Sequence, residues 1–122
     1  AAAPAALVAV EQDAKAVTAC KQNLQRRGLD ARVTTGDANR PPKGRYDVIV
    51  LDPPRQGARA LFEQTPLFPG PKRIVYVSCD TATLGRDLRL AVRFGYRVDR
   101  MIGFDMFPQT AHLESLVRLV RA

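Results

Sequence analysis

Short apolar runs alternate with amphipathic segments along most of the chain. The runs at residues 46–51 and 73–78 are nearly continuous and contain several β-branched residues, a pattern typical of strands that are buried on both faces. Two shorter runs also predict strands, because β-branched residues favour the extended backbone. The strands predicted in this way span residues 7–10, 31–35, 46–51 and 73–78.

Helical spacing of apolar residues marks the segments between the strands. The predicted helices run from Asp13 to about Arg27, from Ala58 to Gln64, and from just after Cys79 to about Phe94. Asp13 is a good N-cap residue, and Gly28 and Gly95 are typical helix stops. Val17, Cys20 and Leu24 fall on one face of the first helix, so we expect Cys20 to be a packed core thiol.

The C-terminal part of the sequence predicts a hairpin. Residues 96–104 and 113–120 read as strands, and residues 105–111 are too few for a crossover connection, so this pair must be antiparallel. Strands alternating with helices imply an α/β fold with a mostly parallel sheet and helices on both faces. At 122 residues the chain is long enough for one domain with one core.

Ionisable residues follow four of the predicted strands. They are Glu11, Asp37, Asp52 and Cys79. Because ligands bind outside the carboxyl ends of parallel strands, these side chains predict a ligand site along one rim. Structural roles are the alternative: a solvated carboxylate at Glu11, a turn at Asp37 beside Gly36, and a strand stop at Asp52.

Cys79 is the candidate nucleophile in this set. It precedes a predicted helix, and the partial positive charge of a helix N-terminus favours the thiolate. An inert, buried thiol is the alternative. Neither Cys79 nor Cys20 lies in a metal-ligand spacing, so no metal site is predicted.

The charge and composition are compatible with a nucleic-acid partner. Lys and Arg number 19 against 12 Asp and Glu, which gives a net charge of +7 and an attraction for phosphates. An arginine-rich composition without that role explains the charge equally well. Arg86, Arg89 and Arg93 share one helical face, which is either solvated or an RNA contact. We find no membrane-length apolar run and no secretory signal, and we expect a cytoplasmic protein.

Three segments resemble motifs of the RNA 5-methyluridine (uracil-C5) methyltransferases. They are DPPRQG at residues 52–57, VYVSCD at 75–80 followed by TL at 83–84 and RDL at 86–88, and DMFPQT at 105–110 followed by His112 and Glu114. The resemblance extends over nearly the whole chain. It implies the Rossmann-like sheet of the class I methyltransferases and the cofactor S-adenosylmethionine.

The resemblance also implies the roles of five residues. Glu11 matches the acid that binds the cofactor ribose, Asp37 the acid near the adenine, and Asp52 the acid near the methionine end. Cys79 matches the nucleophile and Glu114 the general base, with a uridine of ribosomal or transfer RNA as the substrate. Without the resemblance, a rim carboxylate paired with arginine is the simpler interpretation of Glu114.

The sequence departs from the family pattern in two places. Asp80 and Thr81 follow Cys79 where many members have Asn-Pro, which leaves the conformation of that turn open. The family also has a further strand and a Gly-rich loop that cradles the cofactor, and nothing before the strand that ends at Glu11 matches them. We therefore expect residues 1–122 to be the C-terminal portion of a catalytic domain, inactive alone and weak in cofactor binding.

Two other functions remain open. An RNA cytosine-5 methyltransferase resembles the Cys79 segment, but that family has a second cysteine where Arg55 stands here. The chain could instead be a scaffold or RNA-contact module without activity. His112 lies two positions before Glu114 and either orients the substrate or fills space on the same strand face.

Overall fold

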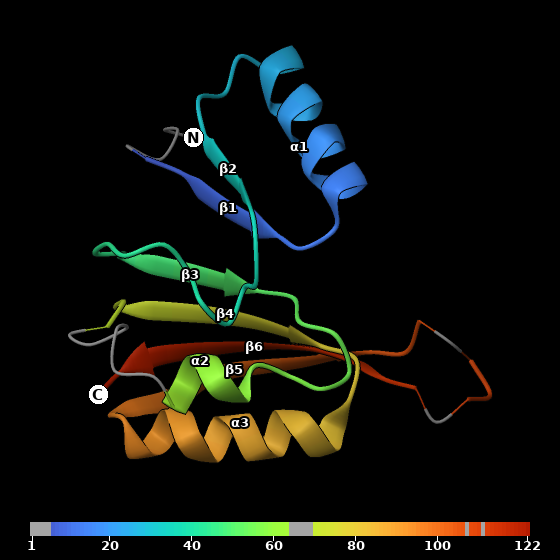
Figure 1. Cartoon of the computed structure of the whole chain (residues 1–122). Coiled ribbons are helices and arrows are strands. Elements are labelled where there is room, and N and C mark those ends of the chain that lie inside the picture. The colour runs from blue at the N-terminus through green and yellow to red at the C-terminus, as the bar shows by residue number, and fades with distance from the viewer. Residues whose placement is uncertain (1–5, 64–69, 107, 111) are drawn as a thin grey trace. The chain divides into compact units, whose positions relative to one another are not determined.

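The computed structural model describes residues 6–63, 70–106, 108–110 and 112–122 (Figure 1). The chain divides into two compact units, Ala1–Pro42 and Lys43–Ala122. Among the described residues, no helix combines the length and the apolar character that a membrane span requires.

The first unit is a strand-helix-strand element. It consists of β1 Val8–Glu11, α1 Ala14–Arg26 and β2 Arg32–Thr35. The two strands pair in parallel, as the connecting helix allows. The predicted cap is confirmed, since the Asp13 carboxylate accepts the Lys15 N–H at 3.0 Å. Gly28 follows the helix with a φ of 63°, a conformation that glycine adopts without strain.

The second unit contains a four-stranded sheet with the order β3-β4-β6-β5 (Figure 1). Its strands are β3 Val48–Leu51, β4 Arg73–Ser78, β5 Tyr96–Phe104 and β6 Glu114–Arg121. β3 and β4 are parallel, and β6 is antiparallel to both β4 and β5. The predicted hairpin is therefore confirmed. Its last strand returns between β4 and β5 and does not extend the sheet at its edge, an order that the sequence pattern did not predict.

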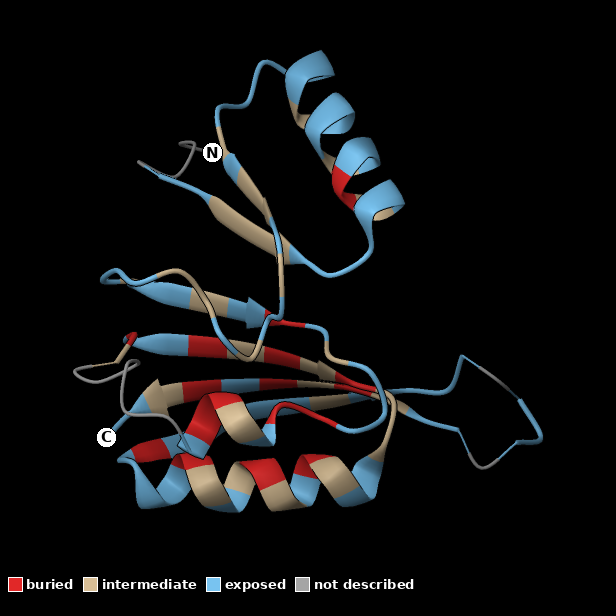
Figure 2. Cartoon of the chain, viewed as in Figure 1, coloured by how far each residue is buried: buried red, intermediate tan, exposed pale blue. Residues whose placement is uncertain are grey.

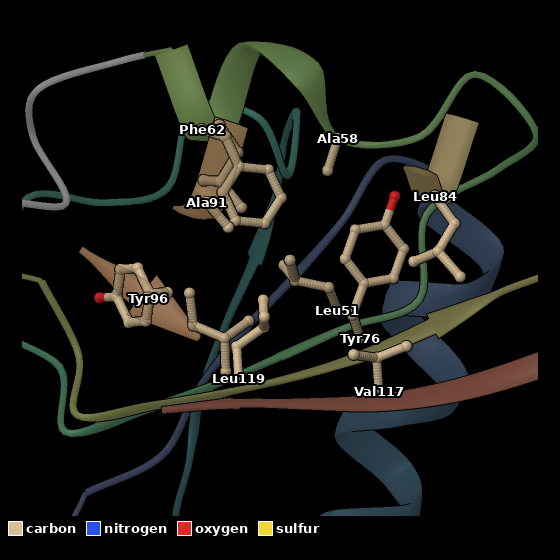
Figure 3. Close-up of a cluster of buried hydrophobic side chains, with 11 residues drawn as sticks. Leu51, Ala58, Phe62, Tyr76, Leu84, Ala91, Tyr96, Val117 and Leu119 are labelled. Atoms are coloured by element: carbon tan, nitrogen blue, oxygen red, sulfur yellow. The ribbon is translucent and has the colours of Figure 1, made fainter. Parts of the chain in front are cut away.

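Two helices cover one face of this sheet. They are α2 Arg59–Glu63 and α3 Thr81–Arg93. Phe62 of α2 stacks on Tyr76 of β4, with ring centroids 6.2 Å apart, and Leu84 and Ala91 of α3 are buried in the same cluster (Figure 3). Gln64, where we expected α2 to end, lies outside the described residues.

The other face of the sheet differs from the prediction for β3. The apolar run predicted a strand that is buried on both faces, but Val48 and Val50 are 52% and 69% exposed (Figure 2). Leu51 is buried and Ile49 packs against the core. The reason is that both helices of this unit lie on the same face, so alternate residues of β3 have no helix of the unit above them.

Cys20 also differs from the prediction. It is half-buried, and so is Cys79. In α1 only Val17 is buried, because a unit of one helix and two strands offers little surface to cover the helix. Burial therefore does not distinguish the two thiols.

We predict that Phe62→Ala lowers the free energy of unfolding by about 3–5 kcal/mol, the usual cost of removing a buried aromatic ring. Phe62 is 2% exposed and stacks on Tyr76. Phe104→Ala is the matched control, because Phe104 is 45% exposed. Urea unfolding of both variants measures the difference, and equal losses would contradict this description of the core.

Candidate functional site

Three of the candidate residues lie at one end of the strands of the four-stranded sheet, an end that is called the edge of the sheet from here on. Asp52 follows β3, Cys79 follows β4, and Glu114 is the first residue of β6. Because β6 runs antiparallel to β4, the start of β6 lies at the same edge as the ends of β3 and β4. The sheet thus brings a thiol and two carboxylates to one edge.

The β4–β6 ladder ends beside two of these residues. Its last pair is Ser78 opposite Ser115. Cys79 is the next residue after Ser78, and Glu114 is the residue before Ser115, so both lie just beyond the same end of the ladder. Both side chains are half-buried.

The Glu114 carboxylate has an unusual environment. Its Oε2 atom is buried and has no hydrogen-bond partner in the described part of the chain. No ion pair joins Glu114 to an arginine among the described residues either, so nothing in that part of the chain supports the simpler interpretation as an arginine-paired rim carboxylate. A buried polar atom without a partner is costly in a folded protein and is typical of a site that binds or reacts.

The turn after Cys79 is formed by Asp80. Its carboxylate accepts the backbone N–H groups of Ala82 and Thr83, each at 3.0 Å, and so caps α3. The hydrogen bond from the Thr83 N–H is the main reason that the pKa of Asp80 is lowered. Ser78 steadies the same turn, because its hydroxyl accepts the Asp80 N–H and donates to the Asp80 carbonyl. The departure from Asn-Pro therefore keeps a well-capped helix directly after the thiol.

Arg55 and His112 connect two loops at this edge. The Arg55 Nη2 atom lies 3.3 Å from the His112 Nδ1 atom. Because β6 begins at Glu114, His112 belongs to the preceding loop, and the expectation that it shares a strand face with Glu114 is wrong. His112 instead meets the segment that follows β3, and the positive charge of Arg55 also helps to lower the pKa of Asp80.

The other two candidate carboxylates belong to the first unit. Glu11 ends β1 opposite Thr35, and Asp37 lies two residues beyond Thr35, so both leave the same edge of the β1–β2 ladder. Both are exposed. Glu11 Oε1 accepts the Gln12 and Asp13 N–H groups at 2.9 and 3.0 Å, and Asp37 Oδ1 accepts the Asn39 N–H at 2.9 Å. The turn role considered for Asp37 is thus real. Two exposed carboxylates on neighbouring strands also suit a ligand that carries hydroxyl and amino donors.

The four residues predicted to share a single rim belong to two different units, and each unit is described by itself. Glu11 is grouped with Asp37, and Asp52 with Cys79 and Glu114. A rim common to both units stays a prediction. Within the described ranges, no three His, Cys, Asp or Glu side chains cluster in a way that could hold a metal ion.

Sequence reasoning missed one residue near this edge. Asp87 of α3 is completely buried, and its Oδ2 atom accepts the Tyr76 hydroxyl at 2.6 Å and the Ala58 N–H at 2.7 Å. A usable signal was present in the sequence, since Asp87 falls between Leu84 and Ala91 on the apolar face of the predicted helix. A charged residue at such a position is rare unless it is paired.

Comparison with known proteins adds independent information. Residues 43–122 match the family model described as tRNA (Uracil-5-)-methyltransferase, and residues 1–65 match the methyltransferase small domain. The chain is 45% identical over 120 residues to the 23S rRNA (uracil(1939)-C(5))-methyltransferase RlmD of Alkalilimnicola ehrlichii, and 39% identical over 117 residues to that of Aeromonas salmonicida. Each alignment covers 90% of this chain.

A solved structure is also similar. The Pyrococcus abyssi tRNA (uracil-54, C5)-methyltransferase in complex with S-adenosyl-L-homocysteine superimposes with a TM-score of 0.80 at 30% identity. The alignment covers 94% of this chain and 29% of that one. The chain spans about a quarter of the length of the two bacterial relatives, 26% in each case.

We predict that Asp80→Ala lowers the thermal midpoint by several degrees at neutral pH, because two N–H groups of α3 lose their acceptor. A lowered folded-state pKa stabilises the fold above the unfolded-state value of about 3.9. The difference from wild type should therefore shrink as the pH falls through the lowered pKa of Asp80. Thr81→Ala, at the first position of α3, is the control that keeps the cap. A difference that does not change with pH in thermal melts would refute this role of the carboxylate.

Proposed function

The chain belongs to the tRNA (Uracil-5-)-methyltransferase family, and from that premise we propose that it methylates C5 of a uridine in ribosomal or transfer RNA. Its fold is the α/β methyltransferase fold. The observation that supports the proposal is that Cys79 follows β4 and Glu114 begins β6, at the same end of the antiparallel β4–β6 ladder.

Cys79 is the nucleophile in this proposal. C5 of uracil is a weak nucleophile, and addition of the Cys79 thiolate to C6 moves electron density to C5 as an enolate. C5 can then attack the methyl carbon of a sulfonium donor, and the carbon–sulfur bond would break with its electron pair left on the sulfur. Covalent catalysis of this kind divides one difficult step into easier ones. Cys79 is half-buried and immediately precedes Asp80, the N-cap of α3, where a helix N-terminus favours the thiolate.

Glu114 is the general base. After methyl transfer, C5 carries both the methyl group and its original hydrogen. The Glu114 carboxylate removes that proton, the C5–H electrons re-form the C5–C6 double bond, and the Cys79 thiolate leaves. A base needs an unoccupied acceptor atom within reach of the proton. Glu114 Oε2, which is buried and without a partner in the described part of the chain, supplies such an unoccupied acceptor.

Three carboxylates are proposed to hold the cofactor. S-Adenosylmethionine, when bound, supplies the electrophilic methyl group. Glu11 would accept hydrogen bonds from the ribose hydroxyls, Asp37 would lie near the adenine, and Asp52 near the methionine end. The exposed carboxylates that follow β1 and β2 have the acceptor chemistry that these donors need.

The surroundings of the thiol favour uridine over the cytosine alternative. Arg55, which stands where RNA cytosine-5 methyltransferases have a second cysteine, is engaged with His112. The unpartnered Glu114 carboxylate argues against a scaffold without activity, because a scaffold gains nothing from that cost. We further propose that residues 1–122 are the C-terminal portion of the catalytic domain, and that the protein acts in the cytoplasm, where its RNA substrate and its two free thiols suggest it belongs.

We predict different defects for the two catalytic residues in the full-length protein. Cys79→Ala should reduce methyl transfer by on the order of 10³-fold or more, because no enolate forms without addition at C6. In Glu114→Gln, Cys79 should still add to C6 and C5 should still take the methyl group, but the methylated RNA should not be released from Cys79. Turnover should therefore fall by about 10²–10⁴-fold. A covalent protein–RNA band that carries labelled methyl should then accumulate on denaturing gels.

Controls separate these effects from loss of folding. Cys20→Ala removes the other free thiol, and Glu63→Gln makes the same change as Glu114→Gln in an exposed ion pair with Arg59. Both controls should turn over normally on 23S ribosomal RNA or transfer RNA. Normal turnover by Glu114→Gln, or an equal yield of adduct from Cys79→Ala, would disprove the assignment of base and nucleophile.

A further inference from the structure

We propose that Asp87 and Arg86 form a positioning pair that holds the 52–57 loop, and with it Asp52 and Arg55, in register with Cys79. The pair belongs to α3, the helix that begins two residues after Cys79. The inference rests on the proposed function, because it assigns a part in methyl transfer to two residues that do not touch the reacting atoms.

The pair forms hydrogen bonds to two backbone groups at the end of the loop. Asp87 Oδ2 accepts the Ala58 N–H at 2.7 Å, and Arg86 Nη2 donates to the Gln56 carbonyl at 2.7 Å. Arg86 is itself oriented by Asp87, since its Nε donates to Asp87 Oδ1 at 3.0 Å. The two contacts flank Gly57, so the loop is fixed on both sides of one residue and to a single helix.

Gly57 shows how closely the loop approaches the pair. A Cβ atom at this position would lie 2.5 Å from Asp87 Oδ2 and 2.8 Å from Arg86 Nη2. Gly57 also has a φ of 75°, a conformation that disfavours other residues. Its N–H donates to the Pro54 carbonyl at 2.9 Å, which closes the turn that presents Arg55. Backbone contact this tight leaves the loop little freedom to shift.

The cost of burying Asp87 indicates that these contacts matter. The Asp87 side chain has no exposure, whereas that of Arg86 is 37% exposed. A buried ion pair often contributes less stability than apolar residues of the same volume would. The carboxylate instead contributes directional hydrogen bonds. Its two oxygens orient the Tyr76 hydroxyl of β4, the Ala58 N–H just after the 52–57 loop, and Arg86 of α3. An apolar residue at this position could fill the core but could not hold the loop.

Substitutions of two side chains in this network, Tyr76 and Arg86, can distinguish a role in core packing from a role in positioning the loop. The Tyr76 hydroxyl points away from the strands, between Ala58 and Leu84, and donates to Asp87 (Figure 3). Burial, and then the bond to Asp87, raises the pKa of Tyr76, so the hydroxyl remains a donor. Loss of this hydroxyl weakens the core and leaves both grips on the loop. Loss of the Arg86 guanidinium removes the grip on Gln56.

The experiment compares Arg86→Met, Arg86→Lys and Tyr76→Phe in the full-length protein. Amide exchange of the 52–60 segment reports on the loop without requiring activity, and single-turnover methylation with the KM for RNA reports on catalysis. We expect Arg86→Met to raise exchange in this segment about tenfold and to lower the methyl-transfer rate by up to about 10²-fold, the cost of a misplacement of about 1 Å, with KM little changed. Arg86→Lys keeps the charge but not the fork geometry and should be intermediate.

Tyr76→Phe is the matched control for a purely structural role. It should lower the thermal midpoint while exchange of the 52–60 segment and the methylation rate stay within about twofold of wild type. If the Arg86 variants instead follow Tyr76→Phe in both readouts, the pair is structural only and the inference is overturned. Should Arg86→Met not fold, the same comparison between Arg86→Lys and Tyr76→Phe decides it.

Failure of the proposed function gives a different result. If the wild-type protein methylates neither ribosomal nor transfer RNA at uridine, the function is wrong, and with it the role in methyl transfer. The difference in amide exchange of the 52–60 segment between the Arg86 variants and Tyr76→Phe would then still test whether Arg86 holds the loop. Normal methylation by wild type and by Arg86→Met alike overturns the positioning pair alone.

Discussion

The antiparallel ladder between β4 and β6 is the constraint on which the rest of the site depends. Ile74 pairs with Leu119 and Tyr76 pairs with Val117, and all four side chains are buried under α2 and α3. Since side chains alternate between the faces of a strand, a slip of one residue would turn this apolar set toward the other face. Core packing therefore fixes the register, and with it the end of the ladder at Ser78 and Ser115, next to Cys79 and Glu114.

Asp87 links that core to the loop beside it. Its carboxylate receives a hydroxyl from β4 and an N–H from the loop before α2, while Arg86 reaches the carbonyl of Gln56. Arg86 thus differs from Arg89 and Arg93, with which it was grouped on sequence grounds, because those two remain exposed on α3. The exposed basic face of α3 therefore contains only Arg89 and Arg93 of these three residues. Arg86 instead forms hydrogen bonds to Asp87 and to the Gln56 carbonyl.

The edge of the sheet combines well-satisfied groups with one that is not. Asp80 Oδ1 accepts two N–H groups as the cap of α3, and the lowered pKa of Asp80 reflects those hydrogen bonds. Arg55 is held against His112 from the adjoining loop. Glu114 Oε2, by contrast, is buried without a partner among the described residues. A buried carboxylate oxygen without a partner is costly, and an unoccupied acceptor of this kind suits the role of general base that we propose for Glu114.

The sequence by itself determined the elements and most of the candidate residues. The N-cap Asp13, the stop at Gly95 and the strands β4 and β5 follow from local chemistry, because caps, turns and alternation act over a few residues. Cys79 was a candidate from its place between a predicted strand and a predicted helix as well as from the motif resemblance, and Glu114 from the resemblance alone. Only the tertiary structure decided that β6 inserts between β4 and β5, that Val50 is exposed, and that Asp87 grips the loop around Gly57. Strand order, the exposed face of a strand and a buried hydrogen-bond network depend on which distant segments meet, and that is set by packing across the whole sheet rather than by local propensity.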